Sequence, residues 1–237
     1  MFNLLQTFAQ KAFLAVEKIF NSLFGERLNP FYYLGAVTYF LLWVVIATGL
    51  YLYAFFETSV NGAYSSVQAL THGQWFVGGV LRSVLRYASD GLALGMVLHL
   101  IRHFTFDHHR GFRWFSWVSG VLLLWLTYAS GVNGYMLPWD RLSQFVVTAT
   151  TEWLDVLPVI GGSMTRNFIS NANVSDRLFS LLSFLHIGIP LILMAVLWVH
   201  TQRVPGAKTN PPRPLMIGIV LSLTALAIIK PAVSQGQ

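Results

Sequence analysis

Three histidines lie within long apolar stretches of this 237-residue chain: His99, His186 and His200. An ionisable side chain is expensive to place in an apolar segment, so each indicates a functional group. His186 and His200 are 14 residues apart in one stretch. Fourteen steps of about 100° nearly complete four helical turns, so both imidazoles share a face and lie about 21 Å apart along the axis.

His99 lies near the end of another apolar stretch, at the depth predicted for His200. We therefore expect these two imidazoles to face each other across two helices. We name their depth the inner level and the depth of His186 the outer level. The other histidines fall in loops or at helix ends, where solvated or interfacial side chains are expected: His72, His103, His108 and His109.

Two pairs of glycines repeat the same interval, Gly35 with Gly49 and Gly120 with Gly134. Each pair supplies one glycine to the inner level and one to the outer level, where a flat group can approach the backbone. Haem fits this arrangement, with imidazoles from one helix pair and glycine clearance from the other. Two simpler explanations compete. Small residues also help membrane helices to pack, and zinc would require three or four close ligands.

The composition is that of a membrane protein. The chain is 55% hydrophobic and only 10% charged, with a mean hydropathy of +0.59, whereas soluble domains carry about a quarter charged residues. The chain has no cysteine, which excludes disulfides, cysteine-ligated iron–sulfur clusters and thioether-attached haem within it. The net charge of +6 is typical of topology-setting loops, so nucleic acid is not an expected partner.

The helices that must position these residues follow from the apolar runs. Five are long enough to approach the roughly 20 residues of a membrane span: 33–56, 76–104, 114–137, 178–202 and 214–230. Apolar residues at helical spacing before residue 30 predict an amphipathic surface helix. We therefore predict an all-α membrane protein. It has an amphipathic helix and entry (1–30), a four-helix haem-binding bundle (31–205), and an extra transmembrane helix and tail (206–237).

Loop charges predict the orientation. Nine basic residues precede the first span or join the second to the third and the fourth to the fifth: Lys11, Lys18, Arg27, Arg102, Arg110, Arg113, Arg203, Lys208 and Arg213. The positive-inside rule then places the N-terminus in the cytoplasm and the C-terminus outside, in the periplasm of a bacterial inner membrane.

Several motifs occur in an order that resembles a known family. They are NPFYYLG with ATG, SVQAL followed by GGVLRSV, WVSGVLLLWLTYASGVNGYMLPWD, DVLPVIGG, and HIGIP with a histidine ten residues after its proline. Over about residues 28–205 the chain resembles the N-terminal, haem-binding half of cytochrome b in its short split form, cytochrome b6. The resemblance implies two stacked b haems, quinone as electron partner, and separate iron–sulfur, c-type cytochrome and C-terminal-half subunits.

By position, the resemblance assigns His99 and His200 to the inner haem and His186 to the outer haem. Arg82 is expected near the outer level, where a haem propionate and a lipid headgroup are equally suitable partners. Asp90 is expected to pair with Arg86 through an i,i+4 contact.

The chain departs from the family at Leu85, 14 residues before His99, where the other outer ligand is expected. Leucine cannot coordinate iron, and sliding the helix by four residues brings Ser89 to that place and His103 to the inner level. Three outcomes remain open: no outer haem, a haem held by His186 alone, or a replacement ligand such as His72 or a partner's residue. Tyr33 stands where photosynthetic members attach an extra haem through cysteine.

We therefore predict a b-type cytochrome subunit of a quinone-linked electron-transfer complex that is not catalytic alone. Quinone is expected near the cytoplasmic face, close to Tyr33, Arg102 and residues 108–110. Two alternatives remain: a structural membrane anchor that keeps one haem, and an ordinary cytochrome b6 with a replacement outer ligand.

Overall fold

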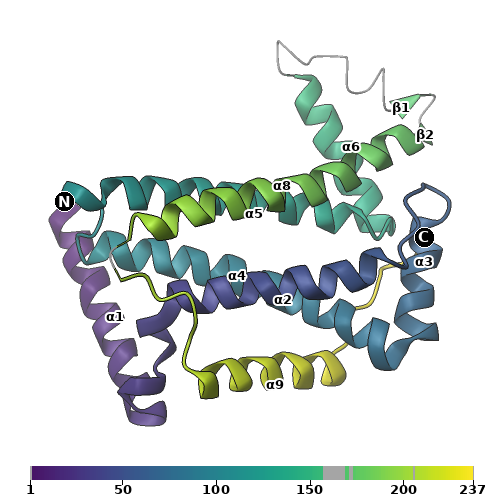
Figure 1. Ribbon diagram of the computed structural model, residues 1–237. Helices are drawn as coiled ribbons and strands as arrows, with labels where there is room; N and C mark the ends of the chain where they lie inside the picture. The colour runs from purple at the N-terminus through teal and green to yellow at the C-terminus, as the bar shows by residue number, and fades with distance from the viewer. Residues whose placement is uncertain (1, 157–168, 171–172, 205, 237) are drawn as a thin grey trace.

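The computed structural model describes residues 2–156, 169–170, 173–204 and 206–236 (Figure 1). Its α-helices are α1 (Phe2–Phe24), α2 (Leu34–Tyr53), α3 (Ala63–Gln68), α4 (Val80–Thr105), α5 (Trp114–Met136), α6 (Arg141–Asp155), α8 (Asp176–Gln202) and α9 (Arg213–Ile229). Short 3-10 turns are η1 (Glu26–Leu28), η2 (Pro30–Tyr33) and η5 (Gly111–Arg113), and two π-helical turns are η3 (Ala69–Gly73) and η4 (Trp75–Gly79). The two-residue strands β1 (Ile169–Ser170) and β2 (Asn173–Val174) pair antiparallel.

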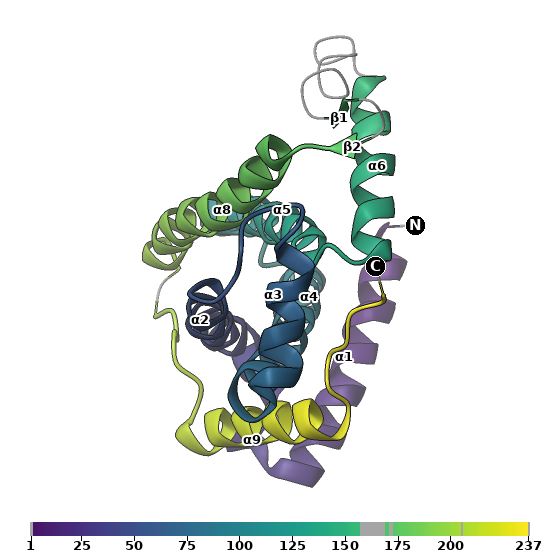
Figure 2. The same ribbon diagram turned by 90° about the vertical axis from the view of Figure 1, so that its right-hand side faces the viewer.

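Four long helices form the predicted bundle, with α2 packed along α4 and α5 packed along α8 (Figures 1 and 2). With their leading turns they are apolar and long enough to cross a membrane: Pro30–Tyr53, Trp75–Thr105, Gly111–Met136 and Asp176–Gln202. The all-α membrane fold is therefore confirmed. We name the end of the bundle beside α1 the inner end, and the end beside α3 and α6 the outer end.

The middle of the bundle is filled by hydrocarbon side chains. One buried cluster takes residues from all four helices: Leu41, Leu42, Ala88, Leu92, Leu123 and Leu193. On each helix these residues fall between the inner-level and outer-level positions of the 14-residue repeat. An apolar layer of this kind stabilises the bundle and separates the two levels.

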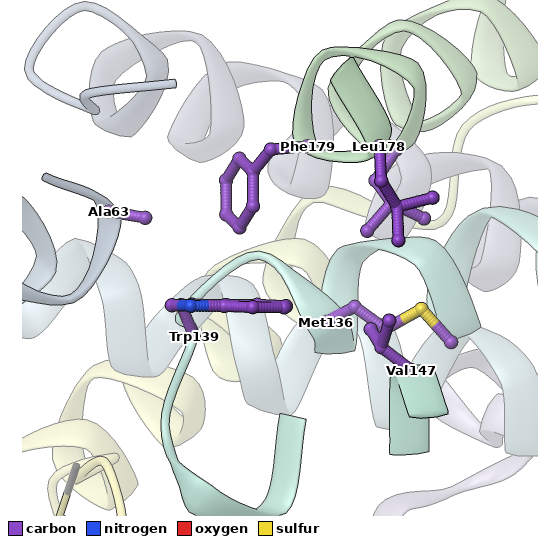
Figure 3. Close-up of a cluster of buried hydrophobic side chains, with 7 residues drawn as sticks. Ala63, Met136, Trp139, Val147, Leu178 and Phe179 are labelled. Atoms are coloured by element: carbon purple, nitrogen blue, oxygen red, sulfur yellow. The ribbon is translucent and has the colours of Figure 1, made fainter. Parts of the chain in front are cut away.

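A second buried cluster closes the outer end (Figure 3). Trp139 lies edge-on to Phe179, with ring centroids 5.1 Å apart. The backbone of Trp139 adopts a φ of 54°, a conformation that non-glycine residues adopt only where their surroundings hold them there. Asp140 then caps α6, because its Oδ1 accepts a hydrogen bond from the Ser143 amide at 2.9 Å.

Helix α6 confirms the prediction that the loop after the third span carries a surface helix. Most of the DVLPVIGG motif lies outside the described residues.

At the inner end, α1 crosses the bundle and is tied to α4 (Figure 1). Glu17, 5% exposed, accepts a 2.8 Å hydrogen bond from Arg102 Nε. Gln6 Nε2 donates to the last-turn carbonyl of Phe104 at 3.1 Å. Apolar side chains such as Phe8 and Ile19 stay exposed on the helix, as expected for a helix lying in a membrane interface.

Helix α9 is the predicted fifth apolar helix, and its 17 residues make it shorter than the other four. Its flanking segments reach both ends of the bundle. Lys208 Nζ lies 5.0 Å from the centre of the Tyr33 ring at the inner end, and the Lys230 carbonyl accepts a 2.6 Å bond from Tyr87 Oη on α4. This course suits the predicted fifth span, which stays a prediction.

Exchanging Glu17 for glutamine tests the attachment of α1. We expect Glu17→Gln to lower the free energy of unfolding by about 1–3 kcal/mol, because it removes the charged acceptor of a largely buried guanidinium. Thermal unfolding in detergent measures the effect. The matched control is Glu26→Gln, an exposed acid on η1, for which we expect a change within about 0.5 kcal/mol. Equal effects of the two variants would contradict a stabilising role for the ion pair.

Candidate functional site

The two inner-level histidines line one cavity between the helices of the bundle. His99 comes from α4 and His200 from α8, and the cavity they share has a volume of about 390 Å³. Gly35 from α2 and Gly120 from α5 line it as well. All four helices therefore contribute to the inner level as the 14-residue interval predicted. The alternative register, which would bring His103 to this level, is not adopted.

Each glycine of the repeat lies against a side chain of the partner helix. A Cβ added to Gly35 would lie 3.0 Å from His99 Cε1, and one added to Gly120 would lie 3.6 Å from His200 Cε1. A Cβ on Gly134 would collide with the ring of His186. The glycines thus make room for the imidazoles themselves. This role is more specific than the general clearance for a flat group that the sequence suggested.

Hydrogen bonds fix two of the imidazoles through Nδ1. The Ser119 hydroxyl donates to the Ser116 carbonyl at 3.0 Å, so it accepts from His200 Nδ1 at 2.9 Å. His186 Nδ1 donates to the Ser130 carbonyl at 3.0 Å. With Nδ1 carrying the proton, Nε2 of each ring keeps its lone pair for a metal.

A row of imidazoles leads from the cavity toward the loop between α4 and α5. The His99 and His103 rings lie 4.4 Å apart between centroids, and the Nδ1 atoms of His103 and His108 are 3.1 Å apart. Burial, together with Arg113 and Arg102, lowers the pKa of His108. Its ring is therefore neutral at neutral pH and can share a hydrogen bond with His103.

The mouth of the cavity is cationic. Its described lining includes no aspartate or glutamate, and its polar side chains near the inner end include Tyr33, Arg102, His108, Arg113 and Lys208. Glu17 balances only Arg102. This mouth is suited to a carboxylate or to a ligand carbonyl oxygen that accepts hydrogen bonds.

The outer level repeats the inner arrangement with one exchange. Leu85 takes the place opposite Gly49, where an added Cβ would lie 3.6 Å from Leu85 Cδ1. His72 is exposed on η3. Arg82 Nη1 donates to Thr71 Oγ1 at 2.6 Å and Nη2 donates to Ser234 Oγ at 2.7 Å.

The predicted pairing of Arg86 with Asp90 is confirmed at 3.2 Å.

Sequence reasoning missed the groups that orient the imidazoles. Ser119 directly precedes Gly120, so its position beside an inner-level glycine was an available signal. The Ser130 carbonyl carried no such signal, because any residue supplies a backbone oxygen. The docking of segment 230–236 onto α4 was equally hidden, since its bonds join residues about 150 positions apart.

Two comparisons with known proteins agree with this arrangement. Residues 19–204 match the family described as cytochrome b/b6/petB. A solved structure titled "Hyperthermophilic respiratory Complex III" is similar in fold, with a TM-score of 0.65 at 18% sequence identity. The match covers 91% of this chain and 63% of that chain, so this chain spans less than two thirds of the length of its structural relative.

Adding a methyl group at Gly134 tests the contact between glycine and imidazole. We expect Gly134→Ala to destabilise the protein by about 1–3 kcal/mol, because the new Cβ collides with His186 and forces repacking. Gly131→Ala is the control on the same helix, since nothing lies within 4 Å of its added Cβ. Its effect should be neutral or stabilising by up to about 1 kcal/mol. Thermal unfolding measures both, and a harmless Gly134→Ala would contradict the close contact.

Proposed function

The chain belongs to the cytochrome b/b6 family, and we propose that it is the b-type cytochrome subunit of a quinone-linked electron-transfer complex. One observation carries the proposal: His99 and His200 line a single cavity at the inner level. Alone the chain performs no complete reaction. It conducts electrons for an oxidoreductase complex whose other centres lie on partner chains.

The inner-level residues fit a haem. His99 and His200 supply two imidazoles from facing helices, and Gly35 and Gly120 leave room for their rings. Ser119 holds His200 with Nε2 available. A bound haem supplies one-electron transfer. The protein's part is to set the orientation of the ligands and to surround the site with hydrocarbon from the central cluster, which excludes water.

Quinone is proposed to exchange electrons near the cationic mouth. Tyr33, Arg102 and the loop of His108 were the expected neighbours, and Tyr33, Arg102 and His108 do line the cavity. Their N–H and O–H groups are donors for quinone carbonyl oxygens. Neutral His108 and its bond to His103 keep one donor in this row at neutral pH.

Partners and orientation complete the proposal. Iron–sulfur or c-type cytochrome subunits, and a separate C-terminal-half chain, are proposed because this chain spans only 63% of its structural relative. The protein is integral to the membrane. We propose a bacterial inner membrane with the N-terminus in the cytoplasm, which the basic residues gathered at the cavity mouth support.

A structural anchor that keeps one haem for folding is the second candidate, and Leu85 favours it. The two functions differ in what the inner haem does. A His99→Ala complex with normal quinone-dependent turnover would support the anchor, whereas lost turnover supports electron transfer.

Removing either inner imidazole tests the proposed ligation. We expect His99→Ala and His200→Ala each to lower the low-spin b-haem content of the purified chain on the order of tenfold or more, because iron loses an axial ligand. Pyridine haemochrome assay and absorption spectra measure it. His72→Ala, at an exposed histidine, is the control and should leave the haem unchanged. Full haem retention in both inner variants would contradict the assignment.

A separate test concerns the orientation of His200. We expect Ser119→Ala to weaken haem binding about 10-fold or more, because the Nδ1 partner of a ligand histidine is lost. Ser130→Ala on the same helix is the matched control, since His186 bonds to the main-chain oxygen of Ser130, which the substitution keeps. Haem titration of the stripped chain gives both affinities. Equal affinities would show that the Ser119 hydroxyl does not orient the ring.

A further inference from the structure

The two levels of the bundle share one pattern of contacts. In three of four places an imidazole lies against a glycine of the paired helix: His99 on Gly35, His200 on Gly120 and His186 on Gly134. In the fourth place Leu85 lies against Gly49. Since Leu85 and His99 are 14 residues apart on α4, as His186 and His200 are on α8, Leu85 occupies the position of a missing imidazole.

From this exchange we infer that the outer level offers iron one imidazole only, and that the chain carries a single low-spin haem, at the inner level. The inference rests on the proposed function for the inner level. Leucine has no lone pair to donate, so a haem with two protein imidazoles does not fit the outer residues. His186 alone keeps Nε2 available there.

The described residues nearest in chemistry do not replace the missing ligand. His72 is exposed on η3. Met136, whose thioether is a known iron ligand, is 3% exposed and packs into the outer cluster with Trp139 and Val147 (Figure 3).

Segment 230–236 holds α4 in the register that presents Leu85. The Ala232 amide donates to the fully buried Ser83 Oγ at 2.9 Å, and Arg82 binds Ser234. These contacts are two and three residues before Leu85 on the same helix. They oppose a slide that would bring another side chain to Gly49. They also engage both terminal nitrogens of Arg82, the residue expected to meet a haem propionate.

A functional consequence follows for the direction of electron flow. With one low-spin haem, this chain exchanges electrons at the inner level and has no second low-spin centre through which to pass them to the outer side. Any transfer across the membrane then requires redox centres on partner chains.

Counting low-spin haems in the full-length protein tests the inference. The wild-type chain, purified from membranes of a haem-sufficient host, should give one low-spin b haem per chain by pyridine haemochrome assay and EPR. Leu85→His should raise this count twofold, because it restores the missing imidazole opposite Gly49. Leu85→Gln is the control for polarity at the same place and should keep the wild-type count.

A double variant assigns the added signal. Leu85→His combined with His186→Ala should return to one low-spin haem, because the gained centre needs both imidazoles. Two low-spin haems in the wild-type chain would overturn the inference. So would a Leu85→His protein that keeps its inner haem but gains no second low-spin signal. A wild-type chain without any low-spin haem would instead overturn the proposed function, a result distinct from finding two.

Discussion

The close contact between an imidazole and a glycine is the interaction on which the bundle depends. Each ring on α4 or α8 needs room that only a residue without a side chain leaves on the paired helix. Because each helix repeats its contact residue after 14 positions, the contacts at the two levels are made together. The hydrocarbon layer between the levels then packs in a single register. Shifting one helix by a residue would turn every one of these side chains away from its partner.

The two ends of the bundle are finished by different chemistry. At the inner end, cations line a cavity mouth, and the buried Glu17 carboxylate ties α1 to Arg102 on the last turns of α4. At the outer end, an aromatic cluster and the segment 230–236 cover the helix ends. The inner end is thus arranged to admit polar ligands, whereas the described outer end is held by contacts within the chain. This difference matches the exchange of a histidine for Leu85 at the outer level.

Much of this arrangement was predictable from the sequence, because helical periodicity is local and exact intervals survive folding. The spacing of His186 and His200, and the glycine pairs, predicted two levels and the pairing of His99 with His200 in one cavity. The spacing could not reveal which atoms orient the rings, since Ser119 acts through a hydroxyl and Ser130 through its backbone. Nor could it predict the bonds of Arg82 to Thr71 and Ser234, which depend on where distant segments meet.

An experimental density map of the haem-loaded complex tests the central claim most directly. We predict iron between His99 and His200, bonded to Nε2 of His200 while Nδ1 keeps its bond to Ser119, and Leu85 in contact with Gly49. An iron at the outer level held by two side chains of this chain would contradict the account. So would an inner level in which the two imidazoles bond to each other or to protein groups with no iron between them.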